Sequence, residues 1–141
     1  MSDSQTPQFE TDAEFLQLIQ PRDEKYVEEL EEDIFDHGCH EAICVWGSIL
    51  IDGHLRYSIC RKWDIRFNIR RLFFQSRDEA EAYICTEQLK RNDLTSEYKK
   101  YLIGRRFRAD MNIASADFLK NHPEKQLNAD GQISQKYVQK T

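Results

Sequence analysis

The fold is decided by residues 42–57, which read AICVWGSILIDGHLRY. Two apolar runs, over 42–46 and 49–52, flank a two-residue Gly-Ser connection, and this arrangement is typical of a β-hairpin. Gly53 then breaks the second run, and apolar residues recur at helical spacing over 55–63. The stretch therefore predicts two paired strands, a glycine turn and a helix, in that order.

Hydrophobic periodicity and capping residues predict the elements on either side of this unit. The capping box Ser76-x-x-Glu79 opens one helix, Asp23 and Thr95 can cap two others, and alternating apolar residues mark a strand. The expected elements are helices over 24–37, 76–89 and 96–108, a strand over 65–69 and a weaker helix over 114–121. The order α-β-β-α-β-α-α predicts an α+β fold, with a small mixed sheet, packed helices and a helical C-terminal extension.

Length and composition are those of a soluble globular protein. The chain has 141 residues, of which 40% are hydrophobic and 32% charged, and no apolar run approaches the roughly 18–20 residues that cross a bilayer. The polar, acidic N-terminus resembles neither a secretory signal nor a transit peptide, so we expect a cytoplasmic protein without a membrane partner. We expect a flexible leader over 1–14, a domain over 15–94, a helical extension over 95–122, and a polar tail or the start of a missing downstream domain over 123–141.

The four cysteines, Cys39, Cys44, Cys60 and Cys85, include no CxxC pair. In a cytoplasmic chain they are expected to be reduced, buried and structural. A zinc site built on His37, Cys39, His40 and Cys44 does not fit the usual ligand spacing, so no metal site is predicted.

The net charge of −5 hides a strong asymmetry. Residues 1–41 hold 13 Asp and Glu against 2 Lys and Arg, whereas residues 42–141 hold 12 against 18. The basic part favours a polyanionic partner such as DNA, although these cations do not form one clean stripe on a helix. The candidate DNA-binding residues are Lys90, Arg91, Lys99, Lys100, Arg105 and Arg106.

The turn Asp52-Gly53-His54-Leu55-Arg56-Tyr57 is the first candidate site. It lies where a strand gives way to a helix, and free backbone N–H groups and the positive end of the helix dipole favour anions there. Arg56 can donate a forked hydrogen bond to phosphate oxygens, and His54 can donate or shuttle a proton. The alternative is an ordinary glycine turn flanked by surface side chains.

The second candidate is the connection Glu87-Gln88-Leu89-Lys90-Arg91-Asn92-Asp93-Leu94-Thr95 between two expected helices. Glu87 or Gln88 could position a metal-bound phosphate, and Arg91 could pair with that phosphate. The alternative is a polar helix–helix connection in which Asp93 and Thr95 act as turn and cap residues.

These two stretches, in this element order, resemble the N-terminal ParB/sulfiredoxin-like domain from about residue 15 to residue 107. The resemblance rests on EELEEDI over 28–34 leading to Gly38, on 42–46, on Ile51-Asp52-Gly53-His54-x-Arg56-Tyr57, and on Glu87-Gln88-Leu89-x-Arg91-x-Asp93-Leu94-Thr95. It implies a partition or regulatory protein that binds DNA, often through a downstream helix-turn-helix domain, and a site for a nucleoside triphosphate with magnesium, either CTP or ATP. The residues expected to bind the nucleotide are Asp52, Gly53, His54, Arg56, Tyr57, Glu87, Gln88 and Arg91.

The chain departs from the ParB motifs at four places. His54 stands where ParB proteins have Glu, Leu55 replaces the first Arg, Gln88 stands where Asn would hold the metal, and Lys90 replaces Gln. The Gly-His-x-Arg form is closer to ParB-like proteins of phages, plasmids and other mobile elements.

The favoured hypothesis is a nucleotide-responsive switch rather than an enzyme of high turnover. Nucleotide binding would reposition the basic helices from Ser96 onward and bias self-association into a homodimer or engagement of DNA. The alternatives are a phosphotransferase or nuclease on the same scaffold, with Asp52 and His54 active, and a degenerate module whose acidic helix binds another protein.

Overall fold

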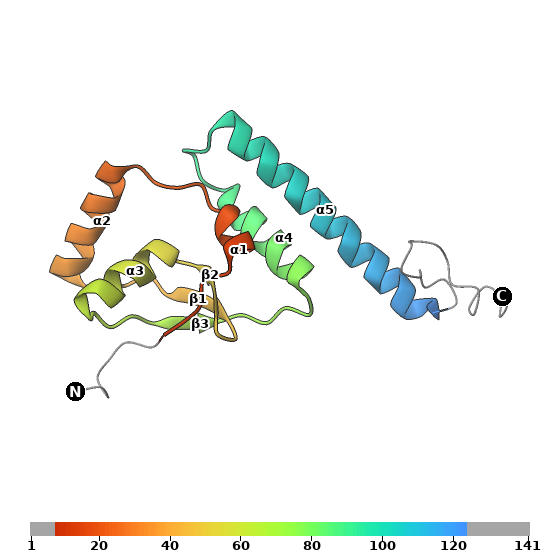
Figure 1. The fold of residues 1–141 in the computed structure, drawn as a ribbon, viewed down its shortest axis with the longest axis horizontal. Coiled ribbons are helices and arrows are strands. Elements are labelled where there is room, and N and C mark those ends of the chain that lie inside the picture. The colour runs from red at the N-terminus through yellow and green to blue at the C-terminus, as the bar shows by residue number, and fades with distance from the viewer. Residues whose placement is uncertain (1–7, 124–141) are drawn as a thin grey trace.

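The computed structural model describes residues 8–123 and contains a small sheet surrounded by helices (Figure 1). The α+β class and the mixed sheet predicted above are confirmed. The elements are α1 (Ala13–Gln17), α2 (Glu24–His37), β1 (Ile43–Trp46), β2 (Ile49–Asp52), α3 (His54–Trp63), β3 (Ile69–Arg71), α4 (Arg77–Gln88) and α5 (Ser96–Asn121).

The sheet has the order β2-β1-β3. β1 and β2 form the predicted antiparallel hairpin, and β3 pairs in parallel with the other edge of β1. The central strand is the most apolar, and Ile43 and Val45 on it are fully buried. The sheet therefore holds the end of β2, and with it the candidate turn, at a fixed place above the core.

Three buried clusters hold the helices to the sheet. The largest joins α1, the hairpin, α4 and α5 through eight residues: Phe15, Leu18, Cys44, Ile51, Ala80, Ile84, Cys85 and Leu102. A second cluster packs α2 on α3 through Ile34, Cys39, Ile59 and Cys60. All four cysteines are buried and unpaired by disulfides, which confirms the burial predicted for them.

The described part of the leader expected over residues 1–14 contacts the rest of the fold. Asp12 caps α1 by accepting a hydrogen bond from the Phe15 backbone N–H, and Glu10 forms a bridge with Ile49. Phe15 and Leu18 then bury their side chains completely, which ties this short helix to the core. Residues 1–7 lie outside the described part of the chain.

The strand expected over 65–69 is shorter and begins later, at Ile69. Pairing starts where the Ile43 N–H donates to the Asn68 carbonyl oxygen, because β1 itself begins only at Ile43. Ile65 and Phe67 still alternate inward, but they pack against the clusters beneath α3. The period-2 pattern over 65–69 thus predicted which side chains face inward, but it predicted more strand pairing than the backbone has.

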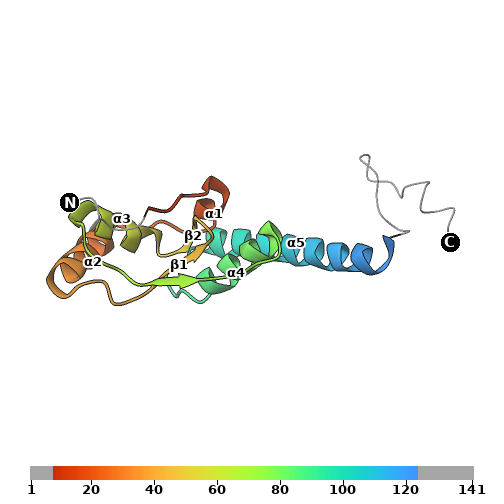
Figure 2. The same ribbon diagram turned by 90° about the horizontal axis from the view of Figure 1, so that it is seen from below.

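The two C-terminal helices expected over 96–108 and 114–121 are one continuous helix, α5. No glycine or proline interrupts residues 109–113, Ala109 is buried, and Asn112 donates a hydrogen bond to Asp78 on α4. With 26 residues, α5 is about 39 Å long, and its last turns project beyond α4 (Figure 2). The tail expected from 123 onward lies outside the described residues except for its first residue.

No helix within residues 8–123 is long and apolar enough to cross a membrane.

Candidate functional site

The turn between β2 and α3 is built on Gly53, the N-cap residue of α3. Its backbone is left-handed, with φ 96° and ψ 27°. A Cβ added there would lie 3.3 Å from the Arg56 Nη2 atom and 3.4 Å from the Ile43 Cγ1 atom. Glycine is needed on both counts, because it adopts positive φ without strain and leaves room for the Arg56 guanidinium.

The N-terminus of α3 is left open for an acceptor. The first intrahelical bond runs from the Tyr57 N–H to the Gly53 carbonyl, and a glycine cap supplies no side chain to accept from the preceding N–H groups. The N–H groups of His54, Leu55 and Arg56 therefore begin the helix without a side-chain cap. Free N–H groups and the helix dipole favour an anion at such a position.

His54 is the first residue of α3, and both of its ring nitrogens are buried without a hydrogen-bond partner among the described residues. Burial lowers the pKa of His54 below 6.5, and the Asp52 carboxylate partly opposes this shift. A buried polar group without a partner costs stability. A ligand that bonds to the ring would remove that cost.

Arg56 also carries an unsatisfied donor, since its Nε atom is buried without a partner in the described part of the chain. Its Nη1 atom lies 3.0 Å from the Glu41 Oε1 atom, and the Glu41 side chain is highly exposed. An ion pair with so exposed a carboxylate is weak, so a phosphate could replace it at little cost.

One small hollow brings together the polar groups of both candidate stretches. It has a volume of about 90 Å³, roughly the space of three liquid waters. Of the residues predicted from the sequence, its lining includes Asp52, Gly53, His54, Arg56, Gln88 and Arg91. The structure thus brings residues of both candidate stretches to one hollow.

Sequence reasoning missed Arg22 and Tyr26, which also line this hollow. The Arg22 guanidinium lies 4.3 Å from the centre of the Tyr26 ring and 3.0 Å from an oxygen of Asp93. One signal was available: Arg22 is one of only 2 basic residues in the acidic segment 1–41. An isolated cation among carboxylates is a candidate for a specific contact.

Arg91 faces the hollow, and its guanidinium already makes four hydrogen bonds within the chain. Its guanidinium donates to both carboxylate oxygens of Asp93, to the Gln88 side-chain oxygen and to the Gln20 carbonyl, at 2.8–2.9 Å. These bonds hold the pKa of Asp93 at about 2. Arg91 therefore ties the end of α4 to the connection between α1 and α2.

Two predicted site residues lie outside the lining of the hollow. The Tyr57 hydroxyl accepts from the Phe9 N–H at 2.8 Å, and its ring packs edge-on against Phe9 and Phe67. Glu87 pairs with Lys90 at 2.9 Å. Tyr57 is thus engaged by Phe9 and Phe67, whereas the Glu87–Lys90 ion pair is partly exposed.

A larger, more apolar hollow adjoins the small one. It has a volume of about 550 Å³, and the two share Ile19, Arg22, His54 and Leu55. The larger hollow also has Leu16, Pro21, Val27 and Tyr98 in its lining. Ligand pockets commonly occupy about 300–1,000 Å³, so this space is large enough for a small organic group beside the polar hollow.

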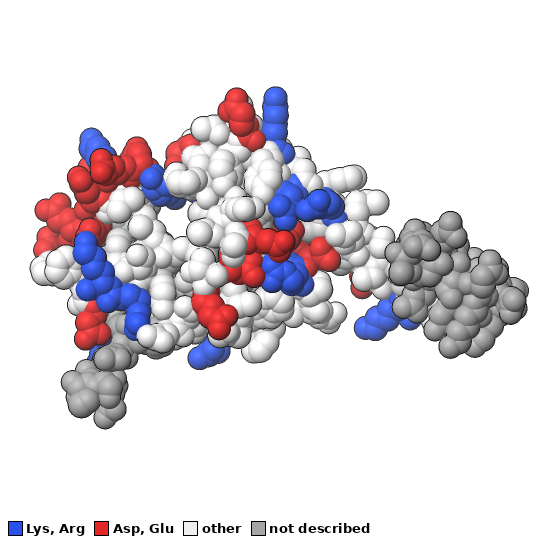
Figure 3. Space-filling model, viewed as in Figure 1, with Lys and Arg blue, Asp and Glu red and all other residues white. Residues whose placement is uncertain are grey.

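The candidate DNA-binding cations do not form one free patch. Arg105 pairs with Glu81 at 3.0 Å, Lys90 pairs with Glu87, and Arg91 is engaged as described. Lys99 and Lys100 are exposed at the start of α5. On the face seen in Figure 3, acidic side chains gather over α2, whereas Lys and Arg occur in several separate places.

Metal ligands are sparse at the hollow. Asp52 is the one carboxylate among the described residues that line it, and within residues 8–123 no group of three His, Cys, Asp or Glu could hold a metal ion. Magnesium that arrives with a nucleotide needs only one or two protein carboxylates, since phosphates and water supply the rest. Asp52 fits that limited role.

The comparisons with known proteins bear on the fold. The structure of a pNOB8-like ParB N-domain matches with a TM-score of 0.60 and 21% sequence identity, over 89% of this chain and 49% of that one. The C222₁ form of a pNOB8-like ParB N-domain matches with a TM-score of 0.57 and 21% identity, over 89% and 52%. The chain has the fold of a ParB N-domain.

The sequence resemblance to the ParB-like domain is thereby confirmed at the level of fold. This chain spans about half the length of the ParB chains that it matches. No protein-family model matches the sequence, and no curated protein matches it either.

Proposed function

We propose that this chain is a nucleotide-responsive domain of a ParB-like DNA-binding protein, of the partition or regulatory kind. In this proposal the β2–α3 turn binds a phosphate group of a nucleoside triphosphate. The observation that carries it is a set of unpaired polar groups at one point: the two His54 ring nitrogens, the Arg56 Nε atom and the uncapped N-terminus of α3.

The His54 ring nitrogens and the Arg56 Nε atom are removed from water without a hydrogen-bond partner among the described residues. A buried polar group left unpaired costs about 1–3 kcal/mol, so its retention needs a reason. A phosphate has several strong acceptor oxygens and can bind an arginine fork, an imidazole and backbone N–H groups together. One bound phosphate would accept hydrogen bonds from all of these groups once the His54 ring carries a proton on both nitrogens.

The dimensions of the two hollows support a nucleotide rather than phosphate alone. The small hollow is large enough for one phosphate-sized group, and the apolar hollow next to it can take a base or sugar. His54 and Arg22 line both, so they lie where a phosphate would join the rest of the ligand. The ParB N-domain fold supports the DNA-related context.

Arg91 provides a route by which binding could reach the basic helix α5. It lines the hollow and bonds to Asp93, which lies in the connection that leads into α5. A phosphate would compete with Asp93 for the Arg91 guanidinium. A shift of Arg91 toward the ligand would loosen the start of α5 and so change the population of its positions.

The proposal is tested by thermal unfolding with magnesium and each of CTP, ATP, GTP and UTP in turn. A ligand at about 100 times its Kd adds about 2.7 kcal/mol to the free energy of unfolding, which raises Tm by about 5–10 °C for a domain of this size. We expect such a rise with at least one nucleotide, CTP being the first candidate.

Magnesium alone and each nucleoside without phosphates serve as controls and should leave Tm unchanged. A rise with ATP alone would favour the phosphotransferase alternative, to be checked by release of phosphate. An unchanged Tm with all four nucleotides would contradict the proposal.

A further inference from the structure

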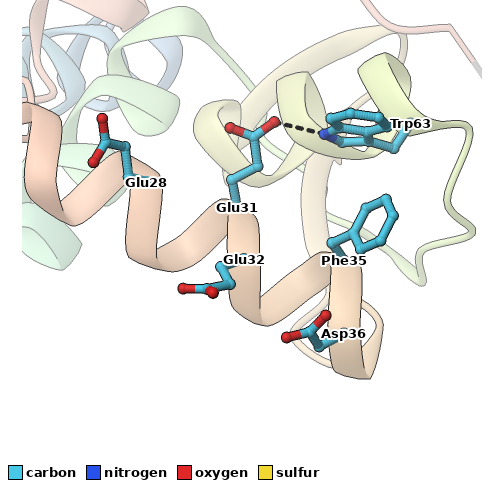
Figure 4. A pocket seen from close by; sticks show the side chains of 6 residues that line it. All are labelled: Glu28, Glu31, Glu32, Phe35, Asp36 and Trp63. Carbon is cyan, nitrogen blue, oxygen red and sulfur yellow. Dashed lines mark hydrogen bonds between the residues drawn. The ribbon is translucent and has the colours of Figure 1, made fainter.

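A second surface lies on the other side of α2, away from the phosphate hollow. It is a shallow groove of about 500 Å³ between α2 and the C-terminal end of α3, and Figure 4 shows the side chains that line it. We call it the acidic–aromatic groove, lined by Glu28, Glu31, Glu32, Phe35, Asp36 and Trp63. None of these residues lines the two hollows described above.

The groove has an exposed aromatic pair. Phe35 is 60% exposed and Trp63 is 45% exposed, and their rings meet edge to face with centroids 5.1 Å apart. Single exposed apolar residues are common, but two large aromatic rings held together in solvent are typical of a contact surface.

The chain's own Lys62 shows which ligand chemistry suits the groove. Its ammonium lies 5.2 Å from the centre of the Trp63 ring and 2.9 Å from the Glu31 carboxylate, to which the Trp63 indole N–H also donates. A cation is thus held between an aromatic face and a carboxylate, an arrangement that recognises ammonium and guanidinium groups.

The negative charge of α2 favours a cationic partner over a nucleic acid at the groove. Its 14 residues include seven Asp and Glu and one Lys. Carboxylates four residues apart repel one another, as Glu28 does Glu32 and Glu32 does Asp36. These three line the groove, and their side chains form no ion pair or hydrogen bond within residues 8–123. They would repel phosphates and attract Lys or Arg side chains.

We propose that the acidic–aromatic groove is a docking site for a basic segment of another protein. One Lys or Arg side chain of that segment packs against the Phe35–Trp63 pair, and its neighbouring cations pair with Glu28, Glu32 and Asp36. This site is independent of the proposed nucleotide function, because the two share no lining residue.

The test is fluorescence anisotropy with a labelled peptide of three Ala-Arg-Leu-Lys repeats, titrated with the full chain at about 0.15 M salt. A peptide with Glu in place of Arg and Lys is the negative control. We expect saturable binding of the basic peptide, weakened about tenfold in the double variant Glu28→Gln/Glu32→Gln, because two carboxylates facing the peptide are removed.

A matched variant separates the groove from net charge. Glu29→Gln/Asp33→Asn removes the same charge and the same i,i+4 repulsion from α2, at positions outside the groove. It should bind the peptide nearly as well as the parent chain. Phe35→Ala keeps all charges and should weaken binding about three- to fivefold through the lost ring contact.

Equal weakening by both double variants would mean that only the net charge of α2 matters, and it would overturn the proposal. Absence of saturable binding of the basic peptide would overturn it as well. Sedimentation of the chain alone completes the test. Self-association abolished by Glu28→Gln/Glu32→Gln would assign the groove to a second copy of the chain and overturn a foreign partner. A Tm no lower than that of the parent chain in each variant verifies that the comparison uses folded protein.

Discussion

The Gly53 turn and the Glu87–Thr95 connection face the same hollow, but they differ in whether their polar side chains have hydrogen-bond partners within the chain. At the turn, the His54 ring and the Arg56 Nε atom are buried without partners among the described residues. In the connection, Arg91 makes four hydrogen bonds within the chain. Both stretches are polar and lie beside the same space, but of the two only the turn has buried polar side-chain atoms without a partner among the described residues. The difference indicates that the turn binds and the connection supports it.

The largest expected effect is the loss of nucleotide affinity when a binding group at the turn is removed. Arg56→Ala should weaken the affinity for the nucleotide about 30- to 160-fold, because it removes charge-assisted hydrogen bonds worth about 2–3 kcal/mol. Its loss should hardly change the fold, since its ion-pair partner Glu41 is exposed. Calorimetric titration measures the affinity, and Lys99→Ala on α5 is the control for general charge. Equal loss in both variants would contradict a specific role for Arg56.

Arg91→Ala should have the complementary effect, lowering the free energy of unfolding by about 2 kcal/mol. The Arg91 side chain is only 10% exposed, and its removal leaves acceptors on Gln20, Gln88 and Asp93 without their donor. Urea unfolding gives the value. The neighbouring Lys90→Ala, which removes one exposed ion pair, should cost less than about 0.5 kcal/mol. An Arg91→Ala chain of unchanged stability would overturn its supporting role.

The Arg91–Asp93 contact also predicts a dependence of stability on acid. Since the pKa of Asp93 is held at about 2 in the fold, against 3.8 for the free group, the contact stabilises the protein above pH 3.8. That contribution is lost as pH falls from about 4 to 2. Stability measured over this range should fall more steeply in the parent chain than in Arg91→Ala, and parallel curves would contradict the assignment.

Gly53→Ala tests whether the turn needs its backbone conformation. We expect a loss of about 1–2 kcal/mol from forcing a side chain into the left-handed region, with further loss from contact with Arg56 and Ile43. Gly47→Ala is the matched control, because Gly47 also has positive φ but has no atom within 4 Å of an added Cβ. Equal losses in unfolding experiments would mean that only backbone strain matters and that the close approach of Arg56 does not.

The smallest effect concerns the protonation of His54. Because burial lowers its pKa below 6.5, the fold favours the neutral ring, and its contribution to stability is present above pH 6.5 and lost as pH falls below it. A bound phosphate should raise the pKa of His54 by favouring the charged ring. Proton NMR of the ring across pH, with and without nucleotide, measures both values. A His54 pKa above 6.5 in the free protein would contradict the burial argument.

Much of the fold was predictable because its signals are local. The hairpin, the Gly53 turn and the caps at Asp23, Ser76 and Thr95 depend on residues within a few positions of one another, and each cap accepts the expected N–H. The short helix α1 was missed because its five residues are stabilised by burial of Phe15 rather than by length. Long-range packing of this kind leaves little trace in a local pattern.

The residues of the candidate site could be predicted from the sequence, but which of their side chains are already hydrogen-bonded within the chain could not. The sequence placed His54, Arg56, Gln88 and Arg91 in two stretches, and the structure brings them to one hollow. Arg91 donates one of its hydrogen bonds to the Gln20 carbonyl, which lies 71 positions away in the sequence and so cannot be recognised from a local pattern. Tyr57 could not be assigned either, because the neighbours that hold it, Phe9 and Phe67, lie in other elements.

Whether the Gly53 turn holds a phosphate group can be measured by a proton–nitrogen NMR titration with inorganic triphosphate and magnesium. We expect saturable shifts that are largest at the backbone N–H groups of residues 53–56, with smaller shifts near Arg91, all abolished in Arg56→Ala. Shifts confined to Lys99 and Lys100 on α5, or no saturable shift at the turn, would contradict it.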